Sequence, residues 1–146
     1  MIEIKEILTK YKNIAMVGVS NDFTKASTIV MGFMQKYGFK VYPVNPRAKY
    51  QKILGEKVFE RITDIKDKID IVNVFRPSKD ALVIAKDTVD IGAKVLWLQL
   101  GIKNDQAKKL VEANKIEYID DKCTKMEYQK LFLKVRQAFP VLQDLD

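Results

Sequence analysis

The chain alternates short, almost continuously apolar runs with amphipathic segments along its length, and this alternation constrains the fold more than any other feature. Each apolar run has the character of a strand that is buried on both faces, as in parallel sheets. The expected strands are 13–19, 39–44, 70–75, 94–99 and 116–119. Such strands, separated by helices, predict an α/β protein with three α/β/α layers and a five-stranded parallel sheet.

The segments between these strands have the periodicity of helices. We expect helices at 2–11, 25–37, 79–91, 104–114 and 124–138, a brief extended piece at 57–59 and a short helical turn at 62–68. Gly38 and Gly92 are typical helix stops, and Ser78 is predicted to cap the helix that follows it. No linker interrupts the pattern, so residues 1–146 are expected to form one domain.

The chain contains no histidine and one cysteine, Cys123. This composition excludes histidine bases, histidine phosphocarriers and histidine metal ligands, and we expect no metal site. A single cysteine cannot form an internal disulfide, which suits the reducing cytoplasm. The N-terminus lacks the order of a signal peptide and no apolar run approaches the ~20 residues that span a bilayer, so a cytoplasmic protein without a membrane contact is expected.

The formal net charge of +7 favours anionic partners. The basic residues are scattered among acids without a long run or interleaved aromatic residues, so a nucleic acid is an unfavoured partner.

Ligands of open parallel α/β sheets bind beyond the carboxyl ends of the strands, where the strand order reverses. The segments expected at that edge are 18–27, 45–47, 75–78 and 99–101. In the first of them, Gly18 allows a close approach of the backbone, Ser20 and Ser27 offer hydroxyls, and the next helix offers N–H groups to a phosphate. The dinucleotide pattern Gly-x-Gly-x-x-Gly is not present. The alternative is that the glycine serves only a turn and the serines only cap.

Arginines follow two of the expected strands, although the chain holds only four, Arg47, Arg61, Arg76 and Arg136. Dinucleotide folds often place an acid after the second strand to bond a ribose hydroxyl, whereas Arg47 suits a ribose that carries a phosphate. Coenzyme A and NADP both have such a ribose, and these residues leave both open. The alternatives are a surface arginine in a turn for Arg47, and core packing in place of adenine stacking for Phe75.

Two further residues lie near the expected site. Gln99 ends an apolar strand and would be a polar group at the mouth of the site. Gly101 either permits a close approach of the ligand or only turns the chain. Cys123 follows the fifth strand, and without a histidine to activate it, packing is the favoured interpretation. We find no pair of side chains that suits acid–base catalysis.

Together these segments resemble the small stand-alone coenzyme A-binding proteins, whose Rossmann-like domain is similar to the N-terminal domain of the succinyl-CoA synthetase α subunit. The resemblance extends from about Ile4 to Phe132, and its most specific pieces are 14–20, 25–27, 42–47, 71–77, 92–101 and 121–123. Their order and spacing carry the resemblance. Ala26 departs from it, since many relatives have proline there.

The resemblance implies a site for the nucleotide half of coenzyme A. The residues that it implies are Gly18, Val19, Ser20, Lys25 and Ser27 at the pyrophosphate, Pro46 and Arg47 at the phosphorylated ribose, Phe75, Arg76 and Pro77 at the adenosine, and Gln99 and Gly101 towards the pantetheine arm. Ligase activity is not implied, because the synthetases need a phosphorylated histidine on a second domain.

We therefore expect non-catalytic binding of coenzyme A or an acyl-CoA, as a carrier, a sensor or a component of a complex. The alternatives are an NADP-dependent reductase and a cysteine-dependent acyl-transfer enzyme that uses Cys123. A protein partner or a homo-oligomer is compatible with this expectation.

Overall fold

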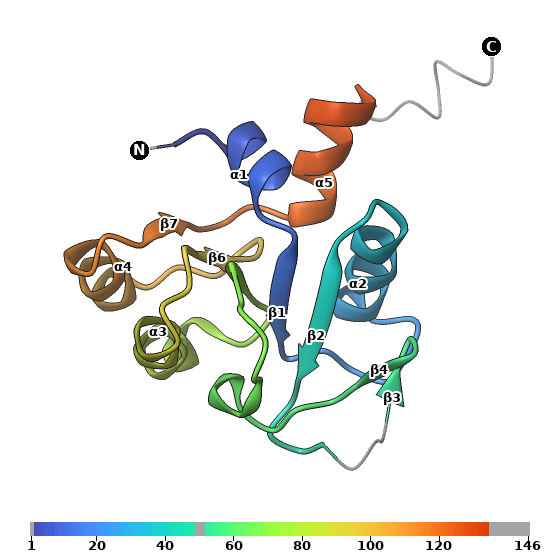
Figure 1. The fold of residues 1–146 in the computed structure, drawn as a ribbon, viewed down its shortest axis with the longest axis horizontal. Coiled ribbons are helices and arrows are strands. Elements are labelled where there is room, and N and C mark those ends of the chain that lie inside the picture. The colour runs from blue at the N-terminus through green and yellow to red at the C-terminus, as the bar shows by residue number, and fades with distance from the viewer. Residues whose placement is uncertain (1, 49–51, 135–146) are drawn as a thin grey trace.

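The computed structural model describes residues 2–48 and 52–134. Its helices are α1 Ile4–Lys10, α2 Ala26–Lys36, α3 Ala81–Asp90, α4 Asp105–Ala113 and α5 Thr124–Tyr128. Its strands are β1 Asn13–Val17, β2 Lys40–Val44, β3 Lys52–Ile53, β4 Glu56–Lys57, β5 Ile71–Val74, β6 Val95–Leu98 and β7 Glu117–Ile119. Five strands pair in parallel in the order β2-β1-β5-β6-β7 (Figure 1), which confirms the predicted five-stranded parallel sheet.

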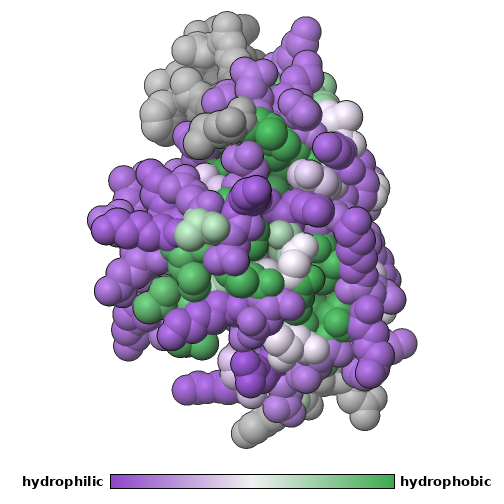
Figure 2. Space-filling view, turned by 60° about the vertical axis from the view of Figure 1, so that its left-hand side comes forward, coloured by the Kyte–Doolittle hydropathy of each residue, from purple (hydrophilic) through white to green (hydrophobic). Residues whose placement is uncertain are grey.

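The sheet is buried on both faces because successive side chains of a strand point to opposite sides. In β1, Ile14 and Met16 join a core with α1, α2 and α5, whereas Ala15 and Val17 join a second core with α3 and α4. Figure 1 shows these two groups of helices on either side of the sheet, so the predicted α/β/α arrangement and Rossmann-like fold are confirmed. Hydrophilic side chains cover most of the face seen in Figure 2, with apolar ones between them.

The strand order reverses between β1 and β5. From β1 the chain passes through α2 to the outer strand β2, and it then returns to the other side of β1 to form β5. The connection that follows β1 and the connection that follows β5 therefore lead in opposite directions. This leaves a space between them at the carboxyl ends of the two strands. The residues at these ends are Val17-Gly18 and Val74-Phe75.

The third predicted helix begins differently from the prediction. Residues Ser78–Asp80 form a 3₁₀ turn, and α3 follows with no side-chain cap at its N-terminus. The predicted capping role of Ser78 is wrong, because its Oγ instead accepts a hydrogen bond from the backbone N–H of Lys103 at 3.0 Å. Asn104, in contrast, caps α4 through its side chain, which accepts from the N–H of Ala107 at 2.8 Å.

Three other predictions differ from the structure. Of the extended piece expected at 57–59, Lys57 belongs to β4, which forms a hairpin with β3, and Phe59 forms an isolated bridge to Val44. The helical turn expected at 62–68 is limited to the 3₁₀ turn Ile62–Asp64. The last predicted helix, 124–138, is α5 followed by a π-helical segment, Gln129–Leu133, and its part from 135 to 138 lies outside the described residues. Within 2–48 and 52–134, the helices are all too short or too polar to cross a bilayer.

Candidate functional site

Gly18 forms the turn that ends β1 at the switch point. Its φ angle is +94°, a conformation that strains residues with a side chain, and its N–H donates to the carbonyl of Val44 at 2.8 Å. A Cβ at this position would lie 3.1 Å from Cδ of Arg76. A larger residue here would therefore require Arg76 or the backbone of Phe75 to shift.

The loop between β1 and α2 is held by its own polar groups. The N–H of Ser20 donates to Oγ of Ser27 at 3.1 Å, and the hydroxyl of Thr28 donates back to the carbonyl of Ser20. Asp22 accepts from both the hydroxyl and the N–H of Thr24, and these hydrogen bonds hold the pKa of the Asp22 carboxyl below its usual range. The loop is thus fixed against the first turn of α2.

This loop encloses a depression of about 270 Å³, which we call the loop depression. Its lining residues are Gly18, Ser20, Lys25, Ala26, Ser27 and Phe75. Lys25 precedes α2 and makes no side-chain cap, and the first N–H groups of a helix have no intrahelical partner. These N–H groups, the helix dipole and the Lys25 ammonium together suit an anion such as a phosphate.

A second depression of about 270 Å³ shares Ala26 and Phe75 with the first, and we call it the apolar depression. Its lining residues are Ala26, Val30, Phe75, Gln99, Leu100, Ile102 and Cys123. Because the two depressions share two lining residues, they adjoin each other, and polar groups that suit a phosphate lie in one and mostly apolar side chains in the other. Such a surface suits a ligand with an anionic head and a less polar arm.

Gln99 is the polar member of that lining, and it is 6% exposed. Its Oε1 accepts from Nδ2 of Asn73 at 3.0 Å and from the N–H and hydroxyl of Thr124 at 3.1 and 3.3 Å. We call these three residues the polar triad. Sequence reasoning missed Asn73 and Thr124; the one signal for Asn73 was a polar residue within an otherwise apolar strand.

The sequence-predicted residues divide into four groups by position. Gly18, Ser20, Lys25, Ser27, Phe75 and Gln99 line the two depressions. Arg76 packs its stem beside Gly18 and pairs with Asp80 at 3.0 Å. Val19 is a fully buried core residue, whereas Pro46, Arg47, Pro77 and Gly101 are exposed at the ends of the strands without lining either depression.

The end of β2 is nevertheless tied to the loop. Nδ2 of Asn45 donates to the carbonyl of Val19 at 2.9 Å, and Oδ1 of Asn45 accepts from the N–H of Arg47 at 2.9 Å. One asparagine therefore connects the turn that carries Arg47 to the loop after β1.

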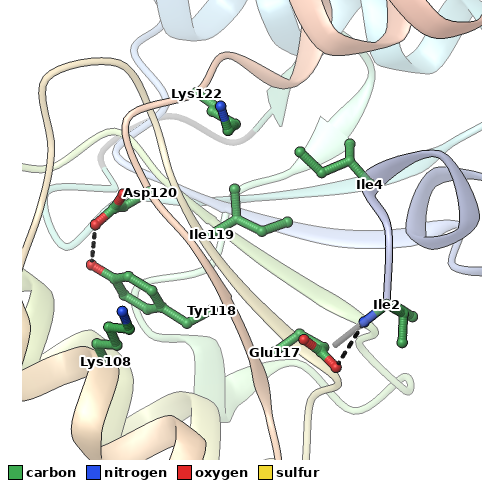
Figure 3. Close-up of a pocket in the computed structure, with 8 residues that line it drawn as sticks. All are labelled: Ile2, Ile4, Lys108, Glu117, Tyr118, Ile119, Asp120 and Lys122. Atoms are coloured by element: carbon green, nitrogen blue, oxygen red, sulfur yellow. Dashed lines mark hydrogen bonds between the residues drawn. The ribbon is translucent and has the colours of Figure 1, made fainter.

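A third depression, of about 250 Å³, lies at the edge strand β7 and is shown in Figure 3. Its carboxylates accept hydrogen bonds from neighbouring groups, Glu117 from the N–H of Ile2 at 3.4 Å and Asp120 from the hydroxyl of Tyr118 at 2.8 Å, and Lys108 and Lys122 also line it. Because ligands of open parallel sheets bind where the strand order reverses, and β7 is an edge strand, we place the candidate site at the switch point. Among residues 2–48 and 52–134, no cluster of acidic or cysteine side chains could hold a metal ion.

The chain is similar to proteins of bacteria and archaea. An uncharacterized protein of Bacillus subtilis, YneT, is 36% identical over 86% of this chain and 92% of its own length. A hypothetical protein from Pyrococcus horikoshii has a solved structure with a TM-score of 0.84 and 37% identity, covering 88% of this chain and 89% of its own. An ADP-forming acetate–CoA ligase of Methanocaldococcus jannaschii is 30% identical over 57% of this chain, which corresponds to 11% of the ligase.

The predicted resemblance is confirmed at the level of the family. The CoA binding domain family matches residues 12–129, which include all five strands of the parallel sheet and both depressions. The similarity to the Methanocaldococcus ligase covers a small part of that protein, and it supports the predicted resemblance to the CoA-binding domain of a CoA synthetase. The chain belongs to the CoA binding domain family.

Proposed function

We propose that the protein binds coenzyme A or an acyl-CoA through its nucleotide half and holds it without catalysing a reaction, as a carrier, a sensor or a component of a complex. The observation that carries the proposal is the loop depression, where Gly18 and the first turn of α2 meet at the switch point in a member of the CoA binding domain family. The pyrophosphate would lie against the N–H groups of that turn, near Lys25 and Ser27.

The two arginines at strand ends support the choice of cofactor. Arg47 follows β2, where its guanidinium fork would reach the phosphate on the ribose, with Pro46 beside it. Phe75, Arg76 and Pro77 would border the adenosine. Gly101, whose N–H donates to Asp121 at 2.8 Å, would close the far side.

Isothermal titration with CoA and 3′-dephospho-CoA tests the proposal. The wild-type protein should bind CoA more tightly, and Arg47→Ala should cost about 1.5–3 kcal/mol of binding free energy for CoA but little for 3′-dephospho-CoA. Arg61→Ala is the matched control, because Arg61 pairs with Asp87 at 3.0 Å next to α3. Equal affinity for the two ligands would remove Arg47 from the site, and absence of binding to both would overturn the proposal.

One observation favours a second candidate function. Cys123 lines the apolar depression, so its thiolate, formed by loss of the thiol proton to solvent, could attack the carbonyl carbon of an acyl thioester. The bond between the acyl carbon and the CoA sulfur would break, and the released CoA thiolate would take a proton from solvent. The absence of histidine from the sequence weighs against this chemistry, because no imidazole can act as its base. Intact-mass spectrometry after incubation with acetyl-CoA should find an unmodified protein, whereas an acetyl adduct absent from Cys123→Ser would support the enzyme.

A simpler measurement distinguishes an NADP-dependent reductase from a CoA-binding protein. A reductase would need a proton donor beside the nicotinamide, and the two depressions offer no histidine and no carboxylate. We expect NADPH to bind more weakly than CoA in the same titration. Tighter binding of NADPH would replace the CoA proposal with this one.

A further inference from the structure

The orientation of the Gln99 amide is determined by its neighbours. The N–H of Thr124 and Nδ2 of Asn73 can only donate, and both point to the same atom of Gln99, at 3.1 and 3.0 Å. That atom must be the carbonyl oxygen, because an amide nitrogen there would face two donors. The oxygen of Gln99 is therefore turned inward, and its NH₂ group is turned away from the polar triad.

The NH₂ group of Gln99 carries two N–H donors and lies on the side of the amide away from Asn73 and Thr124. It has no hydrogen-bond partner within residues 2–48 and 52–134, yet every fully enclosed side-chain nitrogen or oxygen of that part of the chain has a partner. Nε2 therefore reaches the surface, and the depression that Gln99 lines is the apolar one. A side chain that is 6% exposed thus keeps one NH₂ group open at a mostly apolar wall.

We propose that Gln99 is a specificity-determining residue whose Nε2 donates to a carbonyl in the neutral arm of the ligand. One NH₂ group among apolar side chains suits an amide carbonyl flanked by hydrocarbon, as in a pantetheine arm. A polyhydroxylated or charged arm would leave several of its polar groups without partners there. This inference rests on the proposed function, since the anionic head must lie in the loop depression for the arm to reach Gln99.

Asn73 and Thr124 act as positioning residues in this arrangement. Asn73 is fully buried, its Nδ2 also donates to the carbonyl of Trp97 at 3.2 Å, and its Oδ1 accepts from the hydroxyl of Thr124 at 3.2 Å. Each member of the triad therefore fixes the others, and the direction of the Gln99 amide follows from the set.

The test compares CoA with 3′-phosphoadenosine 5′-diphosphate, which has the same nucleotide but no arm. The wild-type protein should bind CoA more tightly. Gln99→Glu keeps an acceptor for Asn73 and Thr124 but replaces the outward donor. The affinity for CoA divided by the affinity for 3′-phosphoadenosine 5′-diphosphate should therefore fall roughly 2- to 10-fold. The negative charge that this substitution adds repels the phosphates of both ligands. Its effect on the two affinities therefore largely cancels in their ratio.

A second pair of variants tests the positioning role. Thr124→Val removes the hydroxyl and should lower the same ratio, whereas Thr124→Ser keeps the hydroxyl and should preserve it. A change of stability alone would shift the melting temperature without changing the ratio. Equal binding of both ligands by the wild type, or a ratio unchanged in Gln99→Glu, would overturn this inference while leaving the proposed function intact. Absence of binding to either ligand would overturn both.

Discussion

Arg76 lies across the backbone of Gly18 at the point where the strand order reverses. A Cβ on Gly18 would lie 3.1 Å from Cδ of Arg76 and 3.3 Å from the carbonyl carbon of Phe75. The glycine also has a φ angle of +94°. The absence of a side chain at this one position therefore permits both the turn of the loop and the packing of the arginine.

Gly18→Ala should destabilise the protein by about 1–3 kcal/mol, because the backbone is strained and Arg76 must move. Gly32→Ala is the control. Gly32 lies within α2, where a Cβ would meet only Cδ1 of Leu54 at 3.5 Å, so this change should be neutral or stabilise by about 0.5–1 kcal/mol. Urea denaturation of both variants measures the difference. Equal effects would contradict the special role of Gly18.

Ser27→Ala should loosen the loop depression. The N–H of Ser20 would lose its acceptor, which lies at 3.1 Å, and the free energy of unfolding should fall by about 1 kcal/mol. The affinity for CoA should fall as well, because the loop would have to be ordered on binding. Thr9→Ala removes an exposed hydroxyl of α1 and should change neither quantity. An unaltered affinity in Ser27→Ala would show that the serine does not order the loop for the ligand.

Tyr42 makes the stability of the protein depend on pH in the alkaline range. Burial, with the hydrogen bond to Asp67, raises the pKa of Tyr42 from 10.0 to about 12. Between these values the unfolded chain releases the proton and the folded protein keeps it, so the free energy of unfolding should fall as the pH rises from 10 to 12. Tyr42→Phe should be less stable at neutral pH but lose stability less steeply in this range. Parallel curves of unfolding free energy against pH would contradict the assignment.

Trp97→Phe should cost about 1–3 kcal/mol of stability. Trp97 is fully buried, and its Nε1 donates to the carbonyl of Lys122 at 2.8 Å, which would lose its partner. Phe23→Ala removes an aromatic ring that is 66% exposed and should change stability by less than about 0.5 kcal/mol. Thermal unfolding of both variants checks the contrast, and similar melting temperatures would refute it.

The parallel sheet could be predicted from the sequence because strands buried on both faces are almost continuously apolar. The run Ile71-Val72-Asn73-Val74 is typical, and it forms β5. The hairpin of β3 and β4 could not be predicted, because its strands have two residues each and its turn is Leu54-Gly55. Leu54 adopts a φ angle of 48°, which leucine rarely does, so the usual Asn-Gly or Asp-Gly signal is missing.

The candidate site was predictable in part. Gly18 and Ser27 follow from the rule that ligands bind at the carboxyl ends of parallel strands, and the structure brings both into the loop depression. The roles of Ser78 and Thr124 could not be read from local spacing. Ser78 bonds to Lys103, 25 positions away, and Thr124 bonds to Asn73 across 51 positions, so only the folded arrangement reveals these partners.

The polar triad also limits how this binding surface can evolve. A single apolar substitution at Asn73, Gln99 or Thr124 leaves a buried donor or acceptor of the other two unpaired. A lineage that acquires a different ligand arm must therefore change these positions together or pass through a less stable intermediate. The exposed residues Pro46 and Arg47 carry no such constraint, so the residues proposed for the nucleotide can change by single steps while those proposed for the arm must change together.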